Sequence, residues 1–163
     1  GGFSTHDASF GEFQGPPEYF ASVIMLLASM PFVRYIQLLA GTAKPLFRDT
    51  QIQTYLATVL VVAVTLALFQ VFYDRRGLEP SIREALFNVT SIISGTGYAS
   101  VDYQEWGAFA AAVFFFLGLV GGCAGSTACS VKIFRYQLLF GAIMQQIRLL
   151  HSPRGIFPLR YGG

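Results

Sequence analysis

Long apolar runs constrain this chain more than any other feature of its sequence. The first covers residues 19–40 and, at 1.5 Å per residue, would reach roughly 33 Å as an α-helix, enough to cross the core of a bilayer. The second covers residues 53–73, is rich in valine and leucine, and carries no charged side chain. Only 12% of the residues are charged, whereas about 25% are charged in a typical soluble domain. The sequence therefore predicts an all-α protein whose main solvent is lipid.

A shorter segment, residues 81–94, is expected to enter the membrane without crossing it. Ser81 and Glu84 have the spacing of a capping box, which predicts a helix that begins there and runs for about 13 residues, too short to span a bilayer. The helix ends at the glycine-rich stretch Ser94-Gly95-Thr96-Gly97-Tyr98. Because lipid does not tolerate non-helical backbone, protein or water must surround this re-entrant segment.

A third apolar run begins near Trp106, is dense in alanine and phenylalanine up to Leu117, and is then interrupted by glycine. A helical pattern resumes at Lys132 and continues to about residue 150. Each glycine would cost a helix about 1 kcal/mol relative to alanine, so we expect a loop at the interruption. Close helix packing through small residues four apart is the alternative. The candidate loop residues are Gly118, Gly121, Gly122, Gly125 and Ser126.

The same order of motifs occurs twice along the chain. Residues 2–7 and 97–102 share the pattern glycine, aromatic, small, hydroxyl, any residue, aspartate. An apolar run and then an Arg-Tyr pair follow each of them, at 34–35 and at 135–136. From glycine to arginine the first copy covers 32 residues (2 to 34) and the second covers 38 (97 to 135). We interpret the surplus of about six residues as an inserted loop, and we expect its deletion to leave a plain helix.

The glycine-rich stretch after the short helix has the chemistry of a cation filter. A dehydrated K⁺ needs several oxygens at short range, and backbone carbonyls can replace its hydration shell. Glycine permits the backbone angles that such carbonyls require, which accounts for Gly95 and Gly97. Tyr98 is expected to pack outward and hold the strand at a set radius. The short helix would aim the negative end of its dipole at the ion.

This stretch resembles the T-V-G-Y-G filter of potassium channels. The more specific resemblance is to the Trk/Ktr/HKT superfamily of potassium uptake proteins, bacterial TrkH type, in which one chain carries four unequal helix–pore-helix–helix repeats. Each repeat has one dependable filter glycine, here Gly2 and Gly97. Residues 121–128 resemble the family's intramembrane loop below the filter, and residues 132–136 resemble the basic helix after it. Cys129 and Ser130 depart from the small or glycine residues that are usual there.

The resemblance covers the whole chain and implies its organisation. Residues 1–45 would be the filter end and second helix of one repeat, and residues 46–163 the next complete repeat with a cytoplasmic tail. We therefore read the chain as an internal fragment of a longer protein. The implied filter residues are Gly2, Phe3, Gly95, Thr96, Gly97 and Tyr98, with K⁺ bound at Gly2, Thr96 and Gly97. The implied gating loop consists of the five candidate loop residues given above.

The resemblance also implies a setting and partners. The expected location is the bacterial cytoplasmic (inner) membrane, in a multi-pass protein that forms a homodimer and pairs with a cytoplasmic nucleotide-binding regulatory subunit. No cofactor is expected besides the transported ion. The net charge of +2 is too small to indicate a nucleic-acid partner.

Lysine and arginine near the ends of the apolar runs predict the orientation, because cytoplasmic loops carry an excess of them. Eight lie on one side: Arg34, Lys44, Arg48, Lys132, Arg135, Arg148, Arg154 and Arg160. Three lie on the other: Arg75, Arg76 and Arg83. The first side is therefore expected to be cytoplasmic. Asp7 and Asp102 would then lie at the outer mouth and add negative potential there.

Other function classes fit less well. A symporter coupled to H⁺ or Na⁺ usually needs an intramembrane acid, and residues 19–40, 53–73 and 106–125 contain no aspartate or glutamate. An intramembrane protease is disfavoured because Ser126 is expected within the membrane, whereas His6 is expected outside and His151 in the cytoplasmic tail. Ser4, His6 and Asp7 are too close in sequence to form a triad, which is recognised by geometry. Cys123 and Cys129 have no neighbouring metal ligands. The sequence predicts no enzyme and does not decide between K⁺ and Na⁺.

Overall fold

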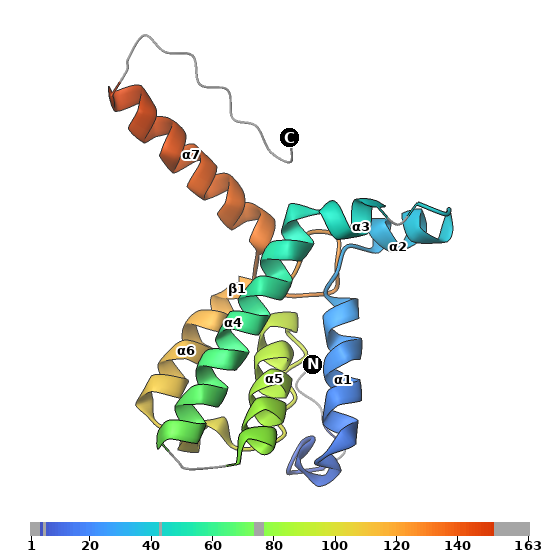
Figure 1. The fold of residues 1–163 in the computed structure, drawn as a ribbon, viewed down its shortest axis with the longest axis vertical. Coiled ribbons are helices and arrows are strands. Elements are labelled where there is room, and N and C mark those ends of the chain that lie inside the picture. The colour runs from blue at the N-terminus through green and yellow to red at the C-terminus, as the bar shows by residue number, and fades with distance from the viewer. Residues whose placement is uncertain (1–3, 5, 43, 74–76, 152–163) are drawn as a thin grey trace.

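The computed structural model describes residue 4 and residues 6–42, 44–73 and 77–151, and this part of the chain is mostly helical (Figure 1). Its elements, in chain order, are η1 (Gly11–Phe13), α1 (Pro16–Ala28), α2 (Phe32–Leu39), α3 (Lys44–Arg48), α4 (Thr50–Tyr73), α5 (Leu78–Ser94), η2 (Tyr103–Trp106), α6 (Ala108–Leu119), β1 (Val120–Gly121), β2 (Val131–Lys132) and α7 (Ile133–His151). The strands β1 and β2 are two residues each and pair in parallel.

Helix α4 confirms the second apolar run. Among the described residues it is the one unbent helix that is both long and apolar enough to cross a membrane. Its apolar surface is only partly covered by the rest of the chain, since Leu60 and Val61 are each 63% exposed. This outer surface suits contact with lipid or with further helices.

The sequence predicted that the first apolar run is one straight span. The structure shows that it is not. Helices α1 and α2 meet at a bend of 91°. The break follows from Pro31, which has no backbone N–H and whose ring clashes with a preceding helical turn. Pro31 also disfavours helical angles at the residue before it, Met30. Most of the run is helical, as predicted, but the first helix ends at Ala28 and a second helix begins at Phe32 in another direction.

The short helix α5 begins earlier than predicted. It covers 17 residues and starts at Leu78, so Ser81 lies inside the helix rather than at its cap. The Ser81 hydroxyl donates to the Gly77 carbonyl at 2.9 Å instead of capping a downstream amide. The predicted capping box is thus wrong. Pro80 fits within the first helical turn, where a missing N–H costs nothing.

Helix α5 is the centre of the fold, and it lies between α4 and α1 in Figure 1. Most of its residues are buried, among them Ala85, Phe87 and Val89, which are fully enclosed. The core around α5 also contains Leu66 of α4 and Phe114 of α6. A short helix surrounded by protein is what a re-entrant segment requires, because lipid could not satisfy its ends.

Candidate ion-conducting site

The filter turn, residues 95–98, leaves the carboxyl end of α5 through two left-handed glycines. Gly95 has φ 76° and Gly97 has φ 79°, angles that L-residues with a side chain rarely adopt. The Gly95 amide donates to the Ile92 carbonyl at 3.0 Å, and the amides of Thr96 and Gly97 donate to the Ser91 carbonyl at 3.0 and 3.2 Å. The prediction that glycine is needed here for its backbone angles is confirmed.

The two glycines differ in what surrounds them. A Cβ atom at Gly95 would lie 2.9 Å from the Cβ of Cys129, which is closer than real Cβ contacts. A Cβ atom at Gly97 would meet no heavy atom within 4 Å. Gly95 is therefore required by both backbone angle and close packing, whereas Gly97 is required by its backbone angle alone.

The carbonyl oxygens of Gly97 and Tyr98 receive no hydrogen bond from any residue that the structure describes. The filter amides turn back into α5, whose carboxyl end carries the negative pole of the helix dipole. Tyr98 is 40% exposed, and its ring centroid lies 6.3 Å from that of Phe10. The turn can thus offer oxygens to a cation. Gly2 and Phe3 lie outside the described residues, so the filter of the first copy stays a prediction.

The glycine-rich interruption is a loop from residue 120 onward. Gly118 and Leu119 still belong to α6, so the predicted start at Gly118 is wrong by two residues. β1 pairs with β2 through Val120 opposite Val131 and Gly121 opposite Lys132, which closes the loop 122–130 at its base. Gly121, Gly122 and Gly125 lie outside any helix, which rules out the alternative of a continuous helix with small-residue packing.

Close approach explains why glycine is needed at the loop's base. A Cβ atom at Gly121 would collide with the Cys129 carbonyl. One at Gly122 would lie 2.8 Å from the Cβ of Ala128 and 2.9 Å from the carbonyl oxygen of Ser29. Because Cys129 also contacts Gly95, the loop packs directly against the start of the filter turn.

The loop docks into the break between α1 and α2. The Cys123 amide donates to the Ser29 carbonyl at 3.0 Å, and the Thr127 hydroxyl donates to the Ala28 carbonyl at 3.0 Å. In return, the Phe32 amide donates to the Gly125 carbonyl at 3.1 Å. Helix ends leave backbone groups without partners inside the helix, and the loop supplies partners for several of them.

Side chains from α4 and β2 also hold the loop. The Gln51 side chain accepts from the Ala124 amide at 3.1 Å, and the Lys132 ammonium donates to the Ser126 carbonyl at 3.0 Å. The Ser126 hydroxyl donates within the loop to the Cys123 carbonyl at 2.6 Å. Sequence reasoning missed Gln51, because nothing local connects it with a residue 73 positions further along.

The tyrosines of the two Arg-Tyr pairs make equivalent contacts, as the internal repeat predicts. The Tyr35 hydroxyl donates to the Leu27 carbonyl at 2.6 Å, and the Tyr136 hydroxyl donates to the Leu119 carbonyl at 3.2 Å. Each acceptor lies in the last turn of the preceding helix. Eight positions separate the first pair of residues and 17 separate the second, so the insertion between helix and tyrosine is nine residues. The predicted surplus of six was smaller because the stretch before the break is shorter in the second copy.

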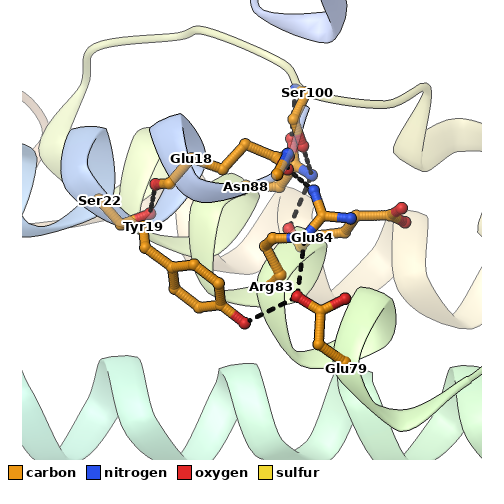
Figure 2. Close-up of polar contacts among 9 residues, drawn as sticks. Glu18, Tyr19, Ser22, Glu79, Arg83, Glu84, Asn88 and Ser100 are labelled. Atoms are coloured by element: carbon orange, nitrogen blue, oxygen red, sulfur yellow. Dashed lines mark hydrogen bonds and ion pairs between the residues drawn. The ribbon is translucent and has the colours of Figure 1, made fainter. Parts of the chain in front are cut away.

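A buried ion pair joins α1 to the first half of α5 (Figure 2). Glu18 is fully buried and pairs with the Arg83 guanidinium. Arg83 also contacts Glu79 at 3.2 Å, and the Tyr19 hydroxyl donates to the same Glu79 oxygen at 3.2 Å. Sequence reasoning missed Glu18, which lies one residue before the first apolar run. Arg83 supplies the opposite charge that this buried carboxylate needs.

An acidic hollow of about 660 Å³ lies beside the residues that follow the filter turn. Its lining includes four exposed carboxylates: Asp7, Glu12, Asp102 and Glu105. His6 pairs with Glu12 at 3.2 Å rather than with a serine, so the structure contains no triad there. In the described part of the chain, no three His, Cys, Asp or Glu residues gather closely enough to hold a metal ion.

The sequence of this chain is similar to those of known proteins. The family model described as TrkH, cation transport protein, matches residues 1–163. The Trk system potassium uptake protein TrkI from Halomonas elongata is 41% identical over 163 residues, which are 99% of this chain and 33% of that protein. The Trk system potassium uptake protein TrkG from Escherichia coli K12 is 32% identical over 169 residues, covering 100% of this chain and 34% of that protein.

A solved structure has the same fold. The crystal structure of the potassium transporter TrkH from Vibrio parahaemolyticus superposes with a TM-score of 0.91 at 26% sequence identity, covering 100% of this chain and 36% of that one. The chain thus spans about a third of the length of the relatives that it matches.

Proposed function

The chain belongs to the TrkH family of cation transport proteins, and from this premise we propose that it forms part of a potassium uptake pathway across a membrane. The observation that carries the proposal is the filter turn: two left-handed glycines, Gly95 and Gly97, at the carboxyl end of a buried re-entrant helix. The ion is inferred from the relatives, which are named potassium uptake proteins.

In this proposal the filter turn binds K⁺ through backbone oxygens. Carbonyl groups replace the water shell of the ion, and the carboxyl end of α5 adds negative potential at the same place. Thr96, Gly97 and Tyr98 would supply one side of the pathway, and Gly2 and Phe3 of the preceding repeat would supply another. The remaining sides would come from repeats beyond this chain.

We propose further that the loop 122–130 is a gate. It contacts the filter turn through Cys129 and Gly95, and its fold depends on a few hydrogen bonds rather than on a packed helix. Loops that move are drawn from the less stable parts of a fold, and in this loop Cys123 and Ala128 are the buried apolar contacts that opening would have to break. Moving the loop away would break its bonds to the helix break and to Gln51.

The wider setting is proposed on the family resemblance. It comprises the bacterial inner membrane, a homodimer, and a cytoplasmic nucleotide-binding regulatory subunit that would act on the gate.

The test is potassium uptake by the intact protein in cells that lack other potassium uptake systems. We expect growth at low external K⁺ and uptake of K⁺ in preference to Na⁺. A protein that reaches the membrane at normal abundance without supporting K⁺ uptake would contradict the proposal.

A further inference from the structure

Asn88 of α5 holds the backbone immediately after the filter turn. Its Oδ1 accepts from the Ser100 amide at 3.3 Å, and its Nδ2 donates to the Ser100 hydroxyl at 3.2 Å. The same Nδ2 donates to the Glu84 carbonyl at 2.8 Å, which fixes the carboxamide on its own helix. Figure 2 shows the Asn88 side chain directed from α5 toward Ser100.

Both partners are shielded from water, since Asn88 is fully buried and Ser100 is 2% exposed. Asparagine is a poor helix former, so its place in the interior of α5 is not explained by helix stability. An apolar residue would leave the buried amide and hydroxyl of Ser100 without these partners, which costs more than the bonds contribute when made. The contact with Ser100 is therefore the reason for asparagine at this position.

The preceding repeat holds the neighbouring residue from the other side. The Ser9 hydroxyl accepts from the Ala99 amide at 3.2 Å, and the Phe10 amide donates to the Ala99 carbonyl at 2.9 Å. Ser9 adopts a left-handed φ of 56°, which is uncommon for a residue with a side chain. Phe10 stacks on Phe87 with ring centroids 4.8 Å apart. Ala99 and Ser100 are thus clamped by two elements, α5 and the Ser9–Phe10 segment, and Ser9 is 90 positions from Ala99 in the chain.

We propose that Asn88 and Ser9 are positioning residues for ion selectivity. They touch no ion themselves. By fixing Ala99 and Ser100 they set where Gly97 and Tyr98 present their carbonyl oxygens. This inference rests on the proposed filter function of residues 95–98.

The clamp also accounts for the hydroxyl in the repeated motif. Ser100 occupies the hydroxyl position of that motif, and Thr5 occupies it in the first copy. The hydroxyl at Ser100 is the group that the Asn88 carboxamide binds. Thr5 lies outside the described residues.

The test compares uptake of K⁺ and Na⁺ by variants of the intact protein. Asn88→Leu removes both bonds to Ser100 at similar volume. We expect its K⁺ to Na⁺ uptake ratio to fall about three- to tenfold, the size of effect expected if the filter geometry loses the equivalent of about one net hydrogen bond. Ser100→Ala is expected to lower the ratio as well, whereas Ser100→Thr keeps the hydroxyl and is expected to retain it.

Thr90→Val is the matched control. Thr90 lies on the same helix and is fully buried, and its hydroxyl has no hydrogen-bond partner in the part of the chain that the structure describes. We expect this variant to keep the parental ratio. An equal fall in Thr90→Val would overturn the proposal, because the effect would then come from a loosened helix.

Gly97→Ser, measured in parallel, separates the two inferences. If it lowers the ratio while Asn88→Leu and Ser100→Ala do not, the filter stands and the positioning role is wrong. If none of the three changes the ratio, the filter assignment itself is wrong. If Asn88→Leu fails to reach the membrane, the two Ser100 variants decide. A K⁺ to Na⁺ ratio that falls in Ser100→Ala and is retained in Ser100→Thr supports the clamp. Equal ratios in these two variants overturn it.

Discussion

At Gly97, glycine is needed for its backbone conformation and not for lack of space. No atom would obstruct a side chain there, yet its φ of 79° lies in the left-handed region. Placing an L-residue in that region costs roughly 1–2 kcal/mol. A substitution at Gly97 therefore either strains the turn or moves its carbonyl oxygens, and both would disturb the proposed ion site before they affect packing.

At this scale we predict that Gly97→Ser lowers the K⁺ to Na⁺ uptake ratio of the intact protein. Gly107→Ser is the matched control, because Gly107 also has a positive φ of 92° and open space around it but lies at the start of α6. Both substitutions place a side chain on a residue with positive φ, so both should lower the thermal stability. Equal ratios in the two variants would place the ion pathway elsewhere.

The helix break and the loop are elements that depend on each other. The break between α1 and α2 exposes backbone groups at Ala28, Ser29 and Phe32, and the loop 122–130 binds all three. Deleting about six residues was expected to leave a plain helix like that of the first copy. That expectation is wrong, because the first copy is itself bent by 91°. A deletion would also strip the break of its partners.

We therefore predict that the Gln51 side chain restrains the proposed gate, the loop 122–130. Gln51→Leu removes the acceptor for the Ala124 amide, and losing such a bond costs about 1 kcal/mol. This shift would raise the population of an undocked loop about fivefold. We expect Gln51→Leu to take up K⁺ faster than the parent and to respond less to the proposed regulatory subunit.

Two further variants serve as controls for this prediction. Gln51→Glu keeps an acceptor and should behave more like the parent. Gln53→Leu removes a side chain of the same kind from the same helix, but Gln53 bonds to Phe47 and not to the loop. Uptake kinetics that are the same in Gln51→Leu and Gln53→Leu would show that docking at Gln51 does not restrain the gate.

At the scale of the whole molecule, the two repeats are joined through buried polar contacts. Glu18 of α1 and Arg83 of α5 form the deepest of these, with Glu18 fully buried and Arg83 about nine-tenths buried. Removing one partner of a buried pair leaves an uncompensated charge, which typically costs about 3–5 kcal/mol. The pair therefore fixes how the repeats sit together.

We predict that Arg83→Met strongly lowers the thermal stability of the purified protein. The double variant Glu18→Met with Arg83→Met should recover much of the loss, because two apolar side chains leave no buried charge. The measurement is the unfolding midpoint in detergent. A double variant no more stable than Arg83→Met alone would mean that the unpaired Glu18 charge is not what destabilises the single variant.

The orientation of the molecule gives a further prediction. In Figure 1, α3 lies at the opposite end of the molecule from the starts of α5 and α6. The excess of lysine and arginine predicts that α3 lies on the cytoplasmic side. Cysteine introduced at Lys44 should therefore react only with reagents that cross the membrane, and cysteine at Tyr103 should react with impermeant reagents. The background must first lack Cys129, which is exposed. External labelling at position 44 would reverse the orientation.

Local signals in the sequence determined the helical class, the span at 53–73, the re-entrant helix, the two left-handed glycines and the repeat. Each of these depends on residues close together in the chain: the length of an apolar run, or the need for glycine at a sharp turn. Such signals are readable because helix length and backbone angles are set largely by neighbouring residues.

Only the tertiary structure decided how these parts bind one another. The bend at Pro31, the docking of the loop on Ser29 and Gln51, and the clamp of Asn88 and Ser9 on the filter all join distant segments. A polar residue in an apolar run shows that it needs a partner, because burying it alone costs free energy. The sequence does not show which partner it finds, since that depends on which backbone groups the folded helices leave unpaired nearby.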